Sequence, residues 1–195
     1  ALIGALGAAA LPSLGSHNRA QLGPANALTL FRAVGVAGLA ALIGERLTPD
    51  VGYAIAFAGG IAFALDGLDG RVARGTGWSS PFGARLDMEL DALTVAVLCA
   101  LAWQLDRVGP WILWCGALRY LFVAASWRWD WMNAPLPPAP RRAIVCGVQI
   151  TTVLLCLPPW PAPFATLSGA LGTAALTASF AIDTVWLYRN RLHPE

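Results

Sequence analysis

Lysine is absent from this chain, and charge of either sign is scarce. All 13 basic residues are arginine, 11 residues are acidic, and charged residues make up 12% of the 195 positions. A soluble domain carries about 25% charged residues, whereas 57% of this chain is hydrophobic. The composition therefore excludes an ordinary soluble domain and predicts an integral membrane protein that folds as one bundle.

Cysteine and histidine are also scarce, and their spacing excludes the metal sites that they commonly build. No cysteine stands in a Cys-x-x-Cys pair or in a cluster with histidine, which excludes a zinc site of that kind. All the cysteines lie in apolar runs, where we expect buried, inert thiols rather than a disulfide framework. They are Cys99, Cys115, Cys146 and Cys156.

The abundant residues are apolar, and they gather in six segments separated by charged or turn-forming residues. Each segment is near the ~20 residues that a helix needs to cross a bilayer, and Trp and Tyr cluster at the segment ends. We therefore predict an all-α integral membrane protein, a six-transmembrane-helix bundle in one catalytic domain over residues 24–195. The segments are Ala27–Ile43, Val51–Ala73, Phe82–Trp103, Pro110–Trp127, Ala143–Leu157 and Pro163–Leu187.

Residues 1–23 form a separate juxtamembrane segment. Its small apolar residues are interrupted by Pro12, Gly15 and several polar residues, so it is too short to be another span. Two interpretations stay open, a helix that lies at the membrane surface and a disordered tail.

Four aspartates stand close together at the end of the second predicted span and the start of the third. Asp66 and Asp69 are three residues apart, and Asp87 and Asp91 are four apart. Each spacing places both carboxylates on one face of a helix. Because a short turn joins the two helices, the two pairs can converge on one point.

Carboxylates gathered near bilayer depth need positive charge beside them. Inserting each one costs about 2.5–3.5 kcal/mol at the bilayer centre, and like charges repel. Arg71, Arg74 and Arg85 could supply the positive charge as ion pairs, or a divalent cation could supply it directly. Oxygen ligands without His or Cys favour Mg²⁺, Mn²⁺ or Ca²⁺ over zinc, and the usual partner of such a cation is a diphosphate.

The same stretch resembles the signature of the CDP-alcohol phosphotransferases, the CDP-alcohol phosphatidyltransferase family. A Pro24-x-Asn26-x-x-Thr29-x-x-Arg32 pattern and the six-span plan are similar too, although a capped helix start explains that pattern equally well. The resemblance covers most of the chain. The signature positions, each at the family's spacing, are Asp66, Asp69, Gly70, Ala73, Arg74, Gly83, Asp87 and Asp91.

This resemblance implies a membrane enzyme of phospholipid synthesis. Such an enzyme transfers a phosphatidyl-type group from a CDP-linked lipid alcohol to an acceptor hydroxyl and releases CMP. We expect CDP-diacylglycerol as the donor, and a smaller CDP-alcohol stays open as the alternative. It implies two Mg²⁺ or Mn²⁺ ions on the donor diphosphate, held by Asp66, Asp69 and Asp87. Asp91 also lies at the metals and acts as general base. The positions that shape and charge the nucleotide pocket are Asn26, Thr29, Gly70, Ala73, Arg74 and Gly83.

The acceptor is a small alcohol or a phosphorylated polyol, and three arginines are candidates to bind it. Arg119 lies midway along the fourth segment, where it either holds an acceptor phosphate or pairs with Asp183 of the sixth. Arg141 and Arg142 open the fifth segment, where they bind the acceptor or act as ordinary topology determinants. The resemblance also implies a homodimer, and we expect no nucleic acid among the partners.

Two other functions compete with the transferase. A divalent-cation transporter or channel would need carboxylates through the whole bilayer depth, and these gather at one side. A non-catalytic membrane protein with a degenerate aspartate site would have lost signature positions, and none is lost here.

The arginines predict the orientation of the bundle. With six spans, both termini and the aspartates share one side, which carries most of the arginines, whereas the other side has only Arg46 and Arg107. The positive-inside rule then predicts a plasma membrane of bacterial type with both termini and the aspartates in the cytoplasm.

Cysteine labelling in intact cells tests this orientation. We expect the variant His17→Cys to be protected from a membrane-impermeant reagent and Thr48→Cys to react with it. The opposite pattern would reverse the predicted topology.

Overall fold

The computed structural model describes residues 24–76 and 81–191, without the side chains of residues 24–29, 65–76 and 81–87. This part of the chain is helical and contains no strand, which confirms the predicted all-α class. The helices are α2 (Pro24–Ala40), α3 (Val51–Thr76), α4 (Pro81–Gln104), η2 (Pro110–Ile112), α5 (Leu113–Arg128), η3 (Asp130–Asn133), α6 (Pro140–Cys156) and α7 (Ala162–Asn190).

The six α-helices follow the six predicted segments, but the prediction of six spans is confirmed only in part. Among the described residues, α7 is the one helix that is long and apolar enough to cross a membrane by length and composition. The apolar stretches of α2 and α3, Leu30–Ala40 and Val51–Ala64, are shorter. The joined ends of α3 and α4 carry the aspartates and several arginines, and α5 and α6 have only 16 and 17 residues.

Proline and glycine mark the helix boundaries. Pro81, Pro110 and Pro140 each stand at the first position of a helix, where the missing N–H costs no hydrogen bond. After α2, Gly44 adopts a positive φ of 92°, which favours glycine. Gln104 at the end of α4 holds that turn, accepting a hydrogen bond from the Gly44 N–H at 2.7 Å and donating to Leu42 O at 3.0 Å.

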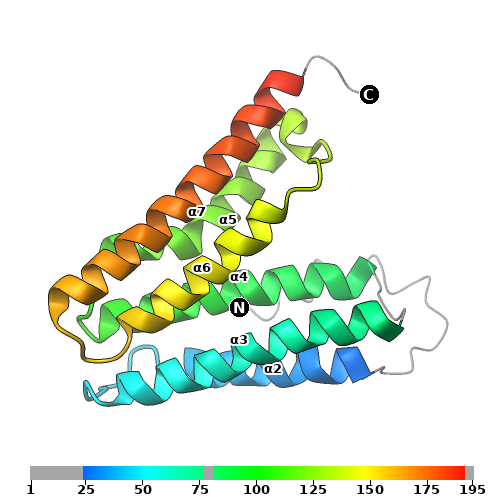
Figure 1. Cartoon of the computed structure of the whole chain (residues 1–195). Coiled ribbons are helices and arrows are strands. Elements are labelled where there is room, and N and C mark those ends of the chain that lie inside the picture. The colour runs from blue at the N-terminus through cyan, green and yellow to red at the C-terminus, as the bar shows by residue number, and fades with distance from the viewer. Residues whose placement is uncertain (1–23, 77–80, 192–195) are drawn as a thin grey trace.

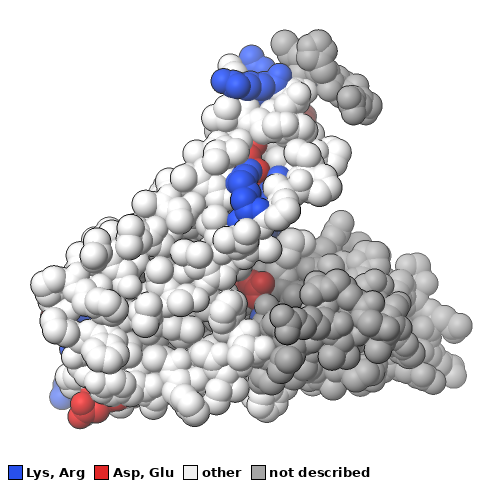
Figure 2. Space-filling model, viewed as in Figure 1, with Lys and Arg blue, Asp and Glu red and all other residues white. Residues whose placement is uncertain are grey.

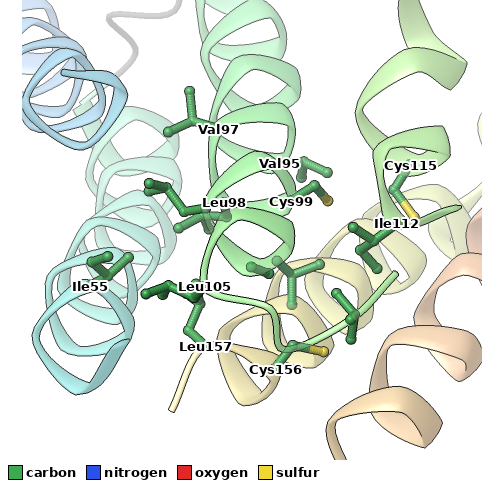
Figure 3. Packing of buried hydrophobic residues seen from close by; sticks show 14 of the residues in the cluster. Ile55, Val95, Val97, Leu98, Cys99, Leu105, Ile112, Cys115, Cys156 and Leu157 are labelled. Carbon is green, nitrogen blue, oxygen red and sulfur yellow. The ribbon is translucent and has the colours of Figure 1, made fainter. Parts of the chain in front are cut away.

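The helix α4 forms the centre of the hydrophobic core. Leu98, Cys99, Leu101 and Ala102 of this helix have no exposed surface. Buried residues of α2, α3, η2, α5, α6 and α7 complete the cluster, which Figure 3 shows around α4. As predicted, the cysteines are free and three of the four are buried.

The helices form two groups. Figure 1 shows α2, α3 and α4 along one part of the molecule and α5, α6 and α7 crossing them at an angle. The contact of α6 with both α3 and α4, and of α4 with α5, joins the groups. The groups diverge toward the end where α3 passes into α4 and where α6 begins and α7 ends (Figure 1). The helices that flank this opening carry the charged residues Arg32, Glu89, Asp91, Arg119, Arg141, Arg142 and Asp183.

The close approach of α4 and α5 depends on Gly116. A Cβ at this position would lie 2.7 Å from Ala96 Cα, which is nearer than van der Waals contact permits. We expect Gly116→Ala to lower the free energy of unfolding by about 1–3 kcal/mol, because α5 must move away from α4.

The matched control is Gly60→Ala in α3, where nothing lies within 4 Å of the added Cβ. This variant should be neutral or more stable by up to about 1 kcal/mol, since alanine favours a helix. Denaturant unfolding of both variants in detergent micelles measures the difference. Equal stability of the two variants would contradict the packing described for α5.

Candidate active site

One side-chain approach in the core relates α3 to α4. A Cβ on Gly59 of α3 would lie 2.7 Å from Leu154 Cδ2 of α6 and 3.4 Å from Leu98 Cδ2 of α4, so the Leu98 side chain reaches toward α3 at this level. Only residues 77–80 separate the end of α3 from the start of α4, and the two helices therefore run antiparallel. Any pair of positions at equal distance from this contact lies at the same level.

The register brings the two aspartate pairs to matching levels. Seven residues from Gly59 toward the joined ends is Asp66, and seven residues from Leu98 in the same direction is Asp91. Seven residues are nearly two turns and about 10 Å, so position 66 lies on the same side of α3 as Gly59, and position 91 lies on the same side of α4 as Leu98. Asp69 and Asp87 lie about one turn further toward the joined ends.

The Asp91 carboxylate binds a buried arginine of α2. Arg32 Nη2 donates to Asp91 Oδ1 at 2.7 Å, and the side chains are 5% and 25% exposed. The guanidinium offsets the charge that Asp91 would otherwise bring into the helix interface, which makes the pair costly to break from either side. Arg32 was not among the predicted site residues and stood only in the helix-start pattern. Its place inside an apolar run is the signal that could have identified it as a functional candidate.

A second ion pair lies on another face of α4. Arg119 of α5 donates from Nη2 to Glu89 Oε1, and both side chains are about one third exposed. Glu89 and Asp91 are two residues apart on a helix, and such neighbours do not share a face. The alternative that Arg119 pairs with Asp183 is therefore wrong, because its carboxylate partner is Glu89.

The carboxylate of Asp183 instead binds both arginines at the start of α6. Arg142 donates to it from Nε at 2.9 Å and from Nη2 at 3.0 Å, and Arg141 donates to it from Nη2. Arg141 Nη1 also donates to Ser179 Oγ at 2.6 Å and to Ser179 O at 3.0 Å. One buried carboxylate between two guanidiniums leaves an excess of positive charge between α6 and α7.

Most of the other predicted site residues lie outside the described side chains. Among the side chains that are described, no group of three His, Cys, Asp or Glu residues comes together. The chemistry of the donor set bears on a metal: the four aspartates offer oxygen ligands alone, and such a set fits a hard divalent cation. The predicted site residues whose side chains are not described are Asn26, Thr29, Asp66, Asp69, Gly70, Ala73, Arg74, Gly83 and Asp87.

One comparison with known proteins gives a match. A family model described as CDP-alcohol phosphatidyltransferase matches residues 23–185, which is most of the chain. No curated protein and no solved structure matches significantly.

Removal of Arg32 tests the buried ion pair. Because Arg32→Gln removes the guanidinium that lies 2.7 Å from the Asp91 carboxylate, we expect it to lower the free energy of unfolding by about 3 kcal/mol. The control Arg119→Gln breaks a pair with about a third of its surface in solvent, so we expect a loss of about 1 kcal/mol or less. Denaturant unfolding in detergent compares the two, and similar losses would show that Asp91 does not depend on Arg32.

Proposed function

Because the chain belongs to the CDP-alcohol phosphatidyltransferase family, we propose that it transfers the phosphatidyl group of CDP-diacylglycerol to an acceptor hydroxyl and releases CMP. Family membership by itself supports a transferase of phospholipid synthesis that uses a CDP-alcohol. The observation that supports the rest is the antiparallel alignment of α3 and α4, in which position 66 of α3 and position 91 of α4 stand equally far along the chain from the level where the Leu98 side chain approaches Gly59.

The four aspartates would hold the metal. Their donor set, oxygen without nitrogen or sulfur, supports Mg²⁺ or Mn²⁺, and two pairs of carboxylates support two ions. When bound, such ions neutralise the diphosphate of the donor and the charge that develops during transfer. Asp66, Asp69 and Asp87 are assigned to the metals alone, and Asp91 is assigned to the metals and the acceptor.

Asp91 would act as general base. It takes the proton of the acceptor hydroxyl, while the acceptor oxygen forms a bond to the phosphorus of the phosphatidyl group. The bond from that phosphorus to the bridging oxygen breaks, and CMP leaves with the bonding electrons. Arg32 holds the Asp91 carboxylate at 2.7 Å, which supports a fixed orientation of the base.

The donor nucleotide would lie beside the aspartates. Gly70 and Gly83 leave room for it, and Arg74 offsets phosphate charge. Ala73 lines the same pocket, and Asn26 and Thr29 close it from α2.

The acceptor would be a phosphorylated polyol bound by Arg141 and Arg142. Two guanidiniums share the single Asp183 carboxylate, so the cluster keeps a net positive charge that favours a phosphate. Arg119, which is bound to Glu89 on another face of α4, is assigned to holding α4 against α5 rather than to the acceptor.

The surroundings of the enzyme are part of the proposal. We assign all six helices to the bilayer, with the joined ends of α3 and α4 at the cytoplasmic surface, and we assign the enzyme to a homodimer. The α7 helix is long and apolar enough to cross, and the family consists of membrane proteins.

A transfer assay tests the reaction. Purified protein with labelled CDP-diacylglycerol, Mg²⁺ or Mn²⁺ and a panel of acceptors should release CMP with a phosphorylated polyol. Excess chelator should abolish the release, and either metal should restore it. Persistent activity in chelator would rule out the metal assignment.

Substitution of Asp91 tests the base. Asp91→Asn should lower transfer by about 10²- to 10⁴-fold while CDP-diacylglycerol still binds, because asparagine keeps an oxygen ligand for the metals but cannot accept the proton of the acceptor hydroxyl. The matched control is Glu89→Gln, two residues away on another face of α4, which should keep near-normal turnover. Normal turnover in Asp91→Asn would remove Asp91 from the chemistry.

A further inference from the structure

An apolar groove runs along the surface between α5, η3 and α7, apart from the aspartates. Its volume is about 490 Å³. Aromatic rings of Trp114, Phe122, Trp129, Trp131 and Phe180 supply much of its wall. Trp114 and Trp129 are nearly half exposed, so the groove opens on the surface.

Three polar side chains in the wall are already hydrogen-bonded within the protein. Trp114 Nε1 donates to Thr177 Oγ1 at 3.2 Å, and Thr177 Oγ1 donates to Thr173 O at 2.7 Å. Thr184 Oγ1 likewise donates to Phe180 O at 2.8 Å. The groove therefore offers an occupant apolar contact and no hydrogen bond from these side chains, which suits a hydrocarbon chain.

The dimensions of the groove also fit a hydrocarbon chain. From Trp114 to Trp129 it follows α5 for about 22 Å, which exceeds one leaflet, about half of a ~30 Å bilayer core. A single extended acyl chain is shorter than this groove and can lie along it.

One end of the groove carries positive charge. Arg128 ends α5 next to Trp129, and the Arg191 guanidinium lies 3.9 Å from the centre of the Tyr188 ring. Tyr188 in turn packs against Trp131 of the groove wall, with ring centres 5.7 Å apart. Figure 2 shows basic atoms gathered at this end of the molecule.

The basic end has an excess of positive charge. Arg189 adds a third exposed guanidinium, and Asp130 of η3 is the one acid among the exposed described residues there. Anionic lipids attract such arginines at a membrane surface.

We propose that this groove seats one acyl chain of an anionic phospholipid from the surrounding leaflet, with its headgroup at Arg128, Arg189 and Arg191. The lipid is neither donor nor acceptor, since the groove lies on α5 and α7 and the aspartates lie on α3 and α4. The site shares with the proposed function only the assignment of the chain to a bilayer. Its ligand class is a diacyl lipid with a negative headgroup.

Native mass spectrometry of the full chain in detergent tests the site, with phosphatidylglycerol and phosphatidylcholine of the same acyl chains as probes. The wild type should retain one phosphatidylglycerol per chain in preference to phosphatidylcholine. Arg128→Gln/Arg191→Gln should weaken phosphatidylglycerol retention by about 30-fold, since each arginine near a charged surface contributes about fivefold. The control Arg46→Gln/Arg107→Gln removes the same charge elsewhere and should retain the lipid.

A groove-filling variant separates lipid from a protein partner. Ala125→Trp should abolish retention of both lipids without changing the oligomeric mass, because the indole occupies the groove. Loss of the dimer with unchanged lipid retention would assign the groove to a second copy and overturn the proposal. Equal retention of the two lipids by the wild type, or unchanged retention in the arginine variant, would also overturn it.

Different outcomes test the lipid site and the transfer reaction. Asp91→Asn should lose CMP release and retain phosphatidylglycerol like the wild type. A protein that releases CMP normally but retains no anionic lipid overturns the lipid site alone.

Discussion

The packing of α4 against the surrounding helices is the constraint on which the rest of the structure depends. Most residues of its middle turns are buried, and Leu98 and Leu101 have no exposed surface. A helix fixed along its length by close-packed neighbours cannot rotate or slide without opening cavities, each of which costs free energy. The faces on which Glu89 and Asp91 stand are therefore set by the core below them.

Each side of that fixed helix holds a different ion pair. The Asp91 carboxylate meets a buried guanidinium from α2, and the Glu89 carboxylate meets a more exposed one from α5. A third carboxylate, Asp183, holds two arginines at the start of α6. In a chain with so few charges, the described pairs bind neighbouring helices to one another and at the same time concentrate charge on the helices beside one opening. Stability and chemistry therefore draw on the same small set of side chains.

The apolar groove and the charged opening are two surfaces of different chemistry. Apolar and aromatic residues of α5 and α7 face outward at the groove, whereas the joined ends of α3 and α4 carry the aspartates. A membrane enzyme with a charged substrate and a lipid surrounding requires both kinds of surface.

The amino-acid sequence by itself determined the helical class, the helix boundaries within a few residues and the spacing of the aspartates. These are local properties, set by apolar runs, by proline at helix starts and by i,i+3 and i,i+4 geometry. The family signature is also contained within one short stretch, and the family match over residues 23–185 confirms it.

Only the tertiary structure decided which charges meet. Arg32 and Asp91 are 59 residues apart in the chain, Arg119 and Glu89 are 30 apart, and Arg142 and Asp183 are 41 apart. Such partners depend on the angle and register at which whole helices pack, to which residues throughout the core contribute. No residue spacing within one segment encodes these pairs. For that reason the sequence suggested Asp183 as the partner of Arg119 and suggested no partner for Arg32.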